Sequence, residues 1–504
     1  MSAELKLSEV AALLAVAQDH AFGQPAGAQL RATVLAQRLA SVAAVDLSVR
    51  EATWWTSTLR FLGCTGHSYD MAVVFGDEIE MRAKSLRVDG SNPLEMLRLM
   101  ISHAGPGRSG IRRLQAIAAV VAGGKREAAM NFRTACEVGE ALAARLGLDP
   151  LVRASLAANF ERWNGRGLPT GTRGENIPLP MRFAQLAQEL EVLSRINGID
   201  DAVATIRRRR GKAYDPDLAD LAVEHAPRWW AEIEPIDPWD AALIVAPNDR
   251  PLDAASIHAT LLVVADFADL KSPWLAGHSR AVADLMSAVT GRDIEAAALL
   301  HDLGRVGVAN PIWDKPAPLT RDERDRAETH SLITEQLLRR TPYTAAFAET
   351  AGAAHERQNA SGYHRHAGAA QLDEHQRLLA TADIYQAMIS LRPHRPAFTI
   401  DAAAGELRTM VTEGRLDAET VERILAAAGH PRQARPQGPG GITGRETEVL
   451  RLVALGLTVR QIADRLVITP KTADHHIQNI YSKIGVSTRG AAALYAIEHG
   501  VLHP

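Results

Sequence analysis

Apolar residues recur along most of the chain at intervals of three and four positions, the spacing of one buried face of an α-helix. The stretches with this spacing are rich in alanine, leucine and arginine and poor in β-branched residues. Such residues favour helices over strands. The pattern therefore predicts an all-α protein.

Two stretches interrupt the helical pattern and divide the 504-residue chain, a length that favours about three domains. Residues 429–441 hold three prolines and four glycines, which cannot continue a helix and indicate a linker. Residues 226–253 carry five prolines and three tryptophans. Because exposed tryptophan is unusual, we expect a connector that packs against a domain. The predicted domains are 1–225, 253–428 and 442–504, with a connector at 226–252 and the linker at 429–441.

The first two domains share a sequence pattern at a fixed distance. ERWNGRGLP begins at Glu161, and ERQNASGYH begins at Glu356, 195 positions later. At the same distance the helical segment 182–193 falls on 377–388. A shared motif followed by a helix in register indicates a duplication. The alternative is a pair of unrelated helix–loop–helix segments.

Composition narrows the function classes. Hydrophobic residues make up 46% of the chain and charged residues 23%, enough to bury real cores. The net charge is −3, so any contact with DNA must be local. Cys64 and Cys136 are too few for a disulfide framework or a cysteine-type zinc site. The sequence shows no signal peptide and no apolar run of about 18 residues, so we expect a cytoplasmic protein without a membrane span.

Histidines and aspartates with metal-ligand chemistry occur in the second domain. His301 and Asp302 adjoin each other in ALLHDLGRVGV, and from one helix both could reach a metal ion at one edge. Imidazole and carboxylate ligands without thiolates suit Mn, Fe, Mg or Zn. The two oxygens of Asp302 can bridge two ions, and a pair of cations can support a phosphoryl displacement. Taken singly, each histidine is equally typical of a surface or core position. The candidate ligands are His278, His301, Asp302, His330, His355 and Asp383.

The order H…HD…H…HE…GY…D in a helical domain resembles the HD phosphohydrolases, specifically the HD-GYP subgroup, which hydrolyses cyclic di-GMP. The resemblance covers roughly residues 253–430. It implies a core metal site and positions for a second metal, and it places Arg305 where the family has a lysine near the substrate phosphate. Asp302 and Arg305 are therefore the expected catalytic residues. The core ligands would be His278, His301, Asp302 and Asp383, and the second metal would use His330 and His355.

Departures from the family pattern fall at the second metal and the substrate loop. The family's His-His-Glu reads Ala354-His355-Glu356, so one ligand is missing. The family's Asp-Gly-x-Gly-Tyr-Pro reads NASGYH at 359–364. His364 and His366 are either substitute ligands or solvated loop residues. We expect one metal site, an incomplete second site and weak hydrolysis of cyclic di-GMP.

The first domain retains no ligand. TLRFLGCT places Arg60 and Phe61 where a histidine and an aspartate are expected. The 195-residue spacing pairs Asp383 with Gln188 and His355 with Phe160, and it sets His330 opposite Ala135 or Cys136. We predict a degenerate HD-like copy that serves packing or dimerisation; the alternative is a sensor of a small ligand. The RRRR run at 207–210 is typical of a solvated helix end.

The third domain has clear helix boundaries. Thr443 and Glu446 form a capping box, and Thr458 and Gln461 form a second one. Thr469 is an N-cap with Pro470 at the first helical position. A short helix, a turn and a longer helix form a helix-turn-helix, and a fourth helix follows 487–488.

The whole third domain resembles the LuxR-type DNA-binding domain, through L-T-x-R-E…G…I-A…L…T…H…I…K…G-V-S-x-R. The resemblance implies a recognition helix that begins at Pro470 and two sets of DNA contacts. Ala473 stands where valine is usual, and Asp474 stands where lysine or arginine is frequent. The domain has seven Lys and Arg residues against five Asp and Glu, so we expect binding to double-stranded DNA as a homodimer. The expected base-facing residues are Lys471, Thr472, Asp474, His475 and Gln478, and the expected phosphate contacts are Arg445, Arg460, Lys483 and Arg489. The alternative is a four-helix protein-interaction module.

These features together predict a transcriptional regulator with an HD-type, phosphohydrolase-like domain that senses or weakly hydrolyses a nucleotide such as cyclic di-GMP. The predicted architecture is all-α, with two HD-like domains in tandem followed by a four-helix LuxR-type domain. The main alternative is an active metal-dependent phosphodiesterase with an accessory DNA-binding domain. A third interpretation makes the HD pair a ligand-binding switch without turnover.

Overall fold

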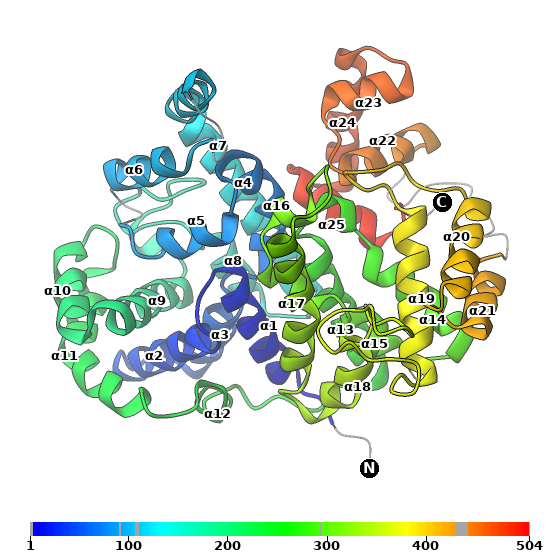
Figure 1. Cartoon of the computed structure of the whole chain (residues 1–504). Coiled ribbons are helices and arrows are strands. Elements are labelled where there is room, and N and C mark those ends of the chain that lie inside the picture. Colours follow the sequence, from blue (N-terminus) through cyan, green and yellow to red (C-terminus); the bar gives the residue numbers. More distant parts are fainter. Residues whose placement is uncertain (1–3, 90–91, 106–109, 293, 430–441, 503–504) are drawn as a thin grey trace. The chain divides into compact units, whose positions relative to one another are not determined.

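The computed structural model describes residues 4–89, 92–105, 110–292, 294–429 and 442–502, and these residues fold as helices joined by loops (Figure 1). The predicted all-α class is confirmed. Contacts divide the chain into an N-terminal unit, Glu4–Asp253, and a C-terminal unit that begins at Ala254 and leaves out Ala309–Pro311. Of the described helices, none combines the length and apolar character needed to cross a membrane.

The N-terminal unit is built around α9, against which α2 and α3 pack. Leu14, Leu35 and Phe183 are fully buried in its core. Its helices are α1 (Leu7–Ala21), α2 (Ala28–Val42), α3 (Leu47–Thr58), α4 (Ser68–Phe75), α5 (Glu78–Ser85), α6 (Pro93–His103), α7 (Gly110–Arg145), α8 (Pro150–Ala157), α9 (Leu179–Asn197), α10 (Ile199–Arg209), α11 (Pro216–Ile233) and α12 (Pro238–Ile244), with 3-10 helices η1 (Leu62–His67) and η2 (Gly174–Asn176).

The predicted connector packs within the N-terminal unit. Helix α11 runs through the predicted boundary at residue 225, and the unit continues to Asp253. Trp229, Trp230 and Trp239 are buried, and Trp54 donates a hydrogen bond from Nε1 to the carbonyl of Ala242 at 2.9 Å. These tryptophans explain why a proline-rich stretch is not a free tether.

The C-terminal unit holds a helical domain followed by four more helices. The domain contains α13 (Ala254–Asp269), η3 (Pro273–Leu275), α14 (His278–Thr290), α15 (Glu295–Leu300), η4 (Leu303–Gly307), α16 (Asn310–Trp313), α17 (Arg321–Leu338), α18 (Pro342–Gly352), α19 (Glu374–Ile389), α20 (Ile400–Thr412) and α21 (Ala418–Ala428). The four final helices are α22 (Gly444–Ala454), α23 (Val459–Leu466), α24 (Pro470–Ile484) and α25 (Arg489–Glu498). The predicted linker lies outside the described residues except for Gly429.

The two helical domains repeat the same local geometry. Helices α9 and α19 begin 195 positions apart, at Leu179 and Glu374. Glu161 accepts a hydrogen bond from the backbone N–H nine residues later at 2.8 Å, and Glu356 does the same at 3.0 Å. These matching contacts agree with the predicted duplication, which stays a prediction.

Contacts of two glycines extend the comparison to the HD motif. A Cβ atom at Gly63 would overlap the carbonyl oxygen of Ala135, and one at Gly304 would overlap that of His330. Ala135 therefore occupies the place of His330, and Arg60 occupies the place of His301. Gly63 and Ala135 are 72 positions apart, whereas Gly304 and His330 are 26 positions apart. The N-terminal copy therefore carries 46 additional residues between these two points, and they include α4 to α6.

The predicted helix boundaries of the C-terminal domain are confirmed. Capping boxes begin α22 at Thr443 and α23 at Thr458. Thr469 accepts a hydrogen bond from the Thr472 N–H and begins α24, with Pro470 in the first turn. Thr488 caps α25. Four helices in this order form the expected helix-turn-helix domain.

Candidate functional site

His301 and Asp302 lie where the chain leaves a helix. Helix α15 ends at Leu300 and η4 begins at Leu303, so the pair occupies the bend between them and not one continuous helix. The Nδ1–H of His301 is 2.7 Å from the carbonyl of Ala298, which leaves Nε2 free to face the centre of the domain. The absence of a side chain at Gly304 allows η4 to pack directly on α17.

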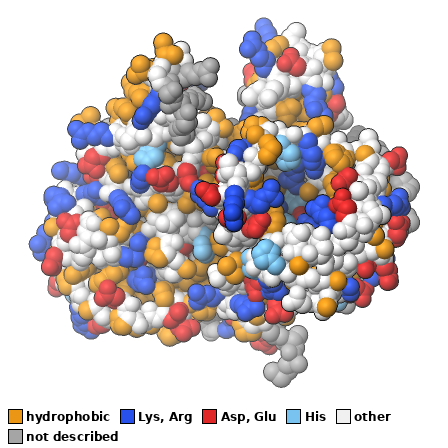
Figure 2. Space-filling view, viewed as in Figure 1, with side chains coloured by type: hydrophobic (Ala, Val, Ile, Leu, Met, Phe, Trp, Pro, Cys, Tyr) orange, Lys and Arg blue, Asp and Glu red, His pale blue; other side chains and the backbone are white. Residues whose placement is uncertain are grey.

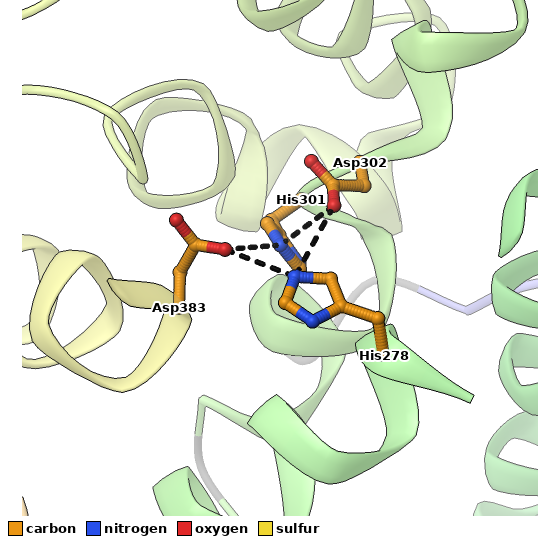
Figure 3. Close-up of side chains that lie close together, drawn as sticks. All are labelled: His278, His301, Asp302 and Asp383. Carbon is orange, nitrogen blue, oxygen red and sulfur yellow. Dashed lines mark hydrogen bonds and ion pairs between the residues drawn. The ribbon is translucent and has the colours of Figure 1, made fainter. Parts of the chain in front are cut away.

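Four buried side chains converge on one point (Figure 3). Nε2 of His278, from α14, is 3.0 Å from Oδ1 of Asp383, from α19, and 3.6 Å from Oδ2 of Asp302. Nε2 of His301 is 3.1 Å from Oδ2 of Asp302 and 3.7 Å from Oδ1 of Asp383. One ligand atom from each residue lies within 4.8 Å of the others, so the four can hold a single cation.

A second group shares Asp302. Nε2 of His330, from α17, and Nε2 of His355 each lie 3.4 Å from Oδ1 of Asp302. The Nδ1–H of His330 is 2.6 Å from the carbonyl of Ala327, which fixes its ring as in His301. The two oxygens of Asp302 therefore face different histidine pairs, the arrangement required of a bridging carboxylate.

The protonation states of four of these side chains suit the binding of a cation. Burial lowers the pKa of His278 and of His330 to about 4, so both rings are neutral. Burial favours protonation of Asp302 and Asp383, but other side chains outweigh it and hold both pKa values well below the usual range. Arg305 and His301 act on Asp302, and His355 together with hydrogen bonds from the histidines acts on Asp383. Neutral imidazole and ionised carboxylate are the forms that bind metals.

His301 differs from its neighbours. Burial disfavours its charged form, but the carboxylates of Asp302 and Asp383 outweigh burial and raise the pKa of His301 to about 10. The Nε2 atoms of His301 and His330 and Oδ2 of Asp302 are buried and form no well-aligned hydrogen bond with any described residue. Because buried polar atoms are nearly always satisfied, these atoms fit a divalent cation, which would displace the proton from Nε2 of His301.

Cationic side chains border the cluster. Nε of Arg305 lies 2.9 Å from Oδ1 of Asp302, and its guanidinium stacks over Trp313 at 5.0 Å. Arg392 donates to the carbonyl of Trp274 at 3.1 Å, and burial together with Arg305 lowers the pKa of Arg392 to about 10. Arg392 was not among the predicted site residues; the signal was an arginine three residues after the end of the helix that carries Asp383.

The loop at residues 359–364 places an aromatic ring against the cluster but adds no further ligand. Tyr363 stacks on His355 with ring centroids 4.8 Å apart, and it contacts the edge of His330. His364 lies 3.5 Å from Glu335 and belongs to neither ligand group. Ala354 is completely buried beside His355 and offers no donor atom.

The equivalent place in the N-terminal unit is filled by its own side chains. Nε of Arg60 donates to Oδ1 of Asn159 at 2.8 Å, and Nδ2 of Asn159 donates back to the Arg60 carbonyl at 2.8 Å. Phe61 stacks on Phe22, and Phe160 stacks on Phe132. Within the described part of this unit no group of three metal-ligating residues comes together.

Helix α24 presents a polar face opposite a buried one. Ala473, Ile477 and Ile480 face the domain core, which explains the small residue at position 473. Arg460 is exposed on α23. The predicted base-facing residues are all exposed: Lys471, Thr472, Asp474, His475 and Gln478. Their contact with DNA stays a prediction.

The other predicted phosphate contacts bond within the domain. Arg445 donates to the Leu466 carbonyl at 2.9 Å, and Arg489 donates to the carbonyl of Gly456 at 3.2 Å. Lys483 lies 2.8 Å from both oxygens of Glu446. This hydrogen bond, followed by the backbone N–H of Thr443, lowers the pKa of Glu446 to about 2.

Comparison with known proteins assigns both parts of the C-terminal unit. The family model for the HD domain matches residues 262–420, and the model for bacterial regulatory proteins of the luxR family matches residues 441–496. The chain therefore carries an HD domain followed by a LuxR-type regulator domain.

Particular relatives extend these assignments. The 3'3'-cGAMP-specific phosphodiesterase 3 of Vibrio cholerae is 28% identical over 410 residues, which is 79% of this chain and 89% of that protein. A crystal structure of a cyclic GMP-AMP specific phosphodiesterase from V. cholerae matches with a TM-score of 0.58 and 26% identity, over 85% of this chain and 99% of the other. The transcriptional regulatory protein LiaR of Bacillus subtilis is 40% identical over 85 residues, 17% of this chain and 39% of that protein. The likeness to the phosphodiesterases thus extends beyond the matched HD domain.

Proposed function

We propose that the chain is a DNA-binding transcriptional regulator whose HD domain holds a divalent metal and responds to a cyclic dinucleotide. The observation that carries the proposal is the pair of buried ligand groups joined through Asp302, in one chain with a LuxR-type domain. The nitrogen and oxygen donors suit Mn, Fe, Mg or Zn. The dinucleotide class is taken from the V. cholerae phosphodiesterase relative.

The side chains around the metal ligands supply the means to bind a phosphodiester. Arg305 and Arg392 bring two guanidinium groups to the cluster, and guanidinium binds phosphate in a bidentate manner. Tyr363 stacks on His355 at one side of the cluster. A bound divalent cation would supply Lewis acidity and lower the pKa of a water molecule.

The incomplete second group argues for slow turnover. His330 and His355 are the two histidines beside the shared carboxylate, and Ala354 adds no donor. A second cation would be weakly held, so the charge of a phosphoryl transition state would be poorly compensated. We therefore favour binding, or weak hydrolysis, as the signal that sets the state of the regulator.

A second candidate function is full phosphodiesterase activity with DNA binding as targeting. It is favoured by the likeness to a phosphodiesterase over 89% of that protein's length. Chromatography of reactions with 3'3'-cGAMP and cyclic di-GMP, with His301→Ala/Asp302→Ala as the blank, separates the two. Turnover in the ordinary range of about 1 s⁻¹ or more would favour the enzyme, and turnover near the blank would favour the regulator.

The DNA-binding part has its own test. We place two copies on the operator, because helix-turn-helix proteins bind two half-sites. Lys471→Ala and His475→Ala should weaken binding to a selected operator tenfold or more, while Lys212→Ala, an exposed lysine of the N-terminal unit, should leave it unchanged. If the intact chain shows no salt-dependent affinity for any DNA in a random pool, the regulator function is wrong.

A further inference from the structure

One end of α7 exposes apolar side chains to solvent. This helix has 36 residues, and its first part belongs to the segment that the metal-binding copy lacks. Ile111 is 72% exposed, Leu114 is 66% exposed and Val121 is 56% exposed. Figure 2 shows hydrophobic side chains gathered at the top of the N-terminal unit, where α7 emerges in Figure 1. Large exposed aliphatic side chains in a row indicate an interaction surface.

The spacing of these residues follows a two-stranded coiled coil. Ile111, Leu114, Ala118 and Val121 are separated by three, four and three positions, which is the a/d repeat of a heptad. Ala118 and Ala122 are exposed as well. We call Ile111, Leu114, Ala118, Val121 and Ala122 the α7 stripe.

Packing on the adjacent flank fixes the direction of the stripe. Ile117, which lies between the stripe residues in sequence, packs against the cluster formed by Phe75, Met81, Leu99 and Ala104. The helix is therefore anchored in its own unit on one side, and the stripe faces outward as a consequence. On the opposite flank, the exposed Gln115 carries no charge that would repel an identical helix, and the exposed charge of Arg113 lies farther from the stripe.

We propose that the α7 stripe is the surface through which two copies of this chain dimerise. An a/d row is self-complementary about a two-fold axis, so the partner that best fits it is another α7. The inference rests on the proposed function in one respect: a helix-turn-helix regulator needs two copies to engage two half-sites. The degenerate copy, which has lost its metal ligands, would then serve to dimerise the chain.

The size of the stripe sets the strength of this contact. Five residues from each copy are few beside the roughly 20–30 residues a side of a standard interface. The dimer should therefore be weak in free solution and should tighten when both LuxR-type domains occupy one operator, since DNA raises the effective concentration of the second copy.

Sedimentation velocity of the intact chain without DNA tests the surface directly. The wild type should shift from monomer towards dimer between about 1 and 100 μM, a range that matches a weak interface. Leu114→Glu should raise the dimer dissociation constant at least tenfold. Leu47→Glu is the matched control, because Leu47 lies in the same unit, has the same side chain and is 68% exposed. Val121→Glu provides a second stripe variant, and circular dichroism verifies that each variant is folded.

The outcomes separate this inference from the proposed function. A wild type that stays monomeric at every concentration, or equal behaviour of Leu114→Glu and Leu47→Glu, would overturn the α7 stripe as the dimer surface. A monomer that still binds operator DNA would leave the regulator function standing. A stripe-dependent dimer with no affinity for DNA would support the surface and contradict the regulator function.

Discussion

Glu356 offers a sharp test of how the ligand cluster is held, because the chain contains its own control. Its carboxylate accepts hydrogen bonds from the N–H groups of Arg365 and Ala367, both at 3.0 Å. These bonds fix the loop that carries Tyr363, which in turn stacks on His355. Glu356 follows a candidate ligand in sequence, yet it belongs to neither ligand group. We therefore predict that it positions the loop and does not bind metal.

The N-terminal unit repeats this arrangement without the ligands. Glu161 accepts hydrogen bonds from the backbone N–H and the hydroxyl of Thr170, each at 2.8 Å. Both glutamates are 1% exposed. In Glu356 each oxygen accepts one N–H, so glutamine sets an NH₂ group against a donor. In Glu161 both bonds end on Oε1, so glutamine can keep them both. Losing one hydrogen bond to a buried carboxylate costs about 2 kcal/mol.

The two substitutions should therefore differ in stability and in metal binding. In units of about 250 residues, a loss of about 2 kcal/mol lowers Tm by about 4–8 °C for Glu356→Gln, and Glu161→Gln should lower Tm less. Metal affinity, measured by competition with a chromophoric chelator, should fall about tenfold for Glu356→Gln, as for other outer-shell partners, and should not change for Glu161→Gln. Equal metal affinity in both variants would refute the positioning role, and loss of metal in both would show that the effect is only general destabilisation.

Three further predictions follow from individual side chains. Ala354→His should raise metal content towards two per chain and increase turnover. The reason is that Asn159, the residue equivalent to Ala354 in the N-terminal unit, contacts Arg60, which occupies the place of His301. Elemental analysis measures the metal content, and the phosphodiesterase assay measures turnover. Val467→Asn should stabilise the LuxR-type domain by about 1 kcal/mol in thermal unfolding, because a β-branched residue holds φ 53° there and is 91% exposed. Between pH 7 and about pH 5, Glu446→Gln should have a lower Tm than the wild type. Below about pH 5 this difference should shrink, because a carboxylate whose pKa is lowered to about 2 contributes stability that is lost as the pH falls towards that pKa.

The sequence could indicate the ligand cluster because the side-chain chemistry of the ligands is visible in it. His278, His301, His330 and Asp383 are far apart in the chain, but their residue types and order are retained, and helices of ordinary length bring them together. The C-terminal helices were equally accessible, since capping boxes at Thr443 and Thr458 are local signals. Where local chemistry decides the structure, sequence analysis succeeded.

Tertiary contacts decided the remaining features, and no local pattern revealed them. Arg392 approaches the cluster because α19 ends beside it. Lys483 pairs with Glu446 across two helices, although the resemblance to LuxR-type domains implied a phosphate contact. His301 and Asp302 occupy a bend where the apolar pattern predicted continuous helix. The 46 additional residues of the N-terminal copy shift the first half of that copy out of the 195-residue spacing, so this half could not be aligned with the second copy by the spacing alone.

The most direct test of the central claim is the metal content of the purified chain by mass spectrometry, after exchange against a weak chelator. We predict about one tightly held divalent cation per chain in the wild type, none in His301→Ala/Asp302→Ala, and an unchanged content in Arg60→Ala/Phe61→Ala, the equivalent pair in the N-terminal unit. Equal metal in the wild type and the His301→Ala/Asp302→Ala variant, or loss of metal on changing Arg60 and Phe61, would contradict the account.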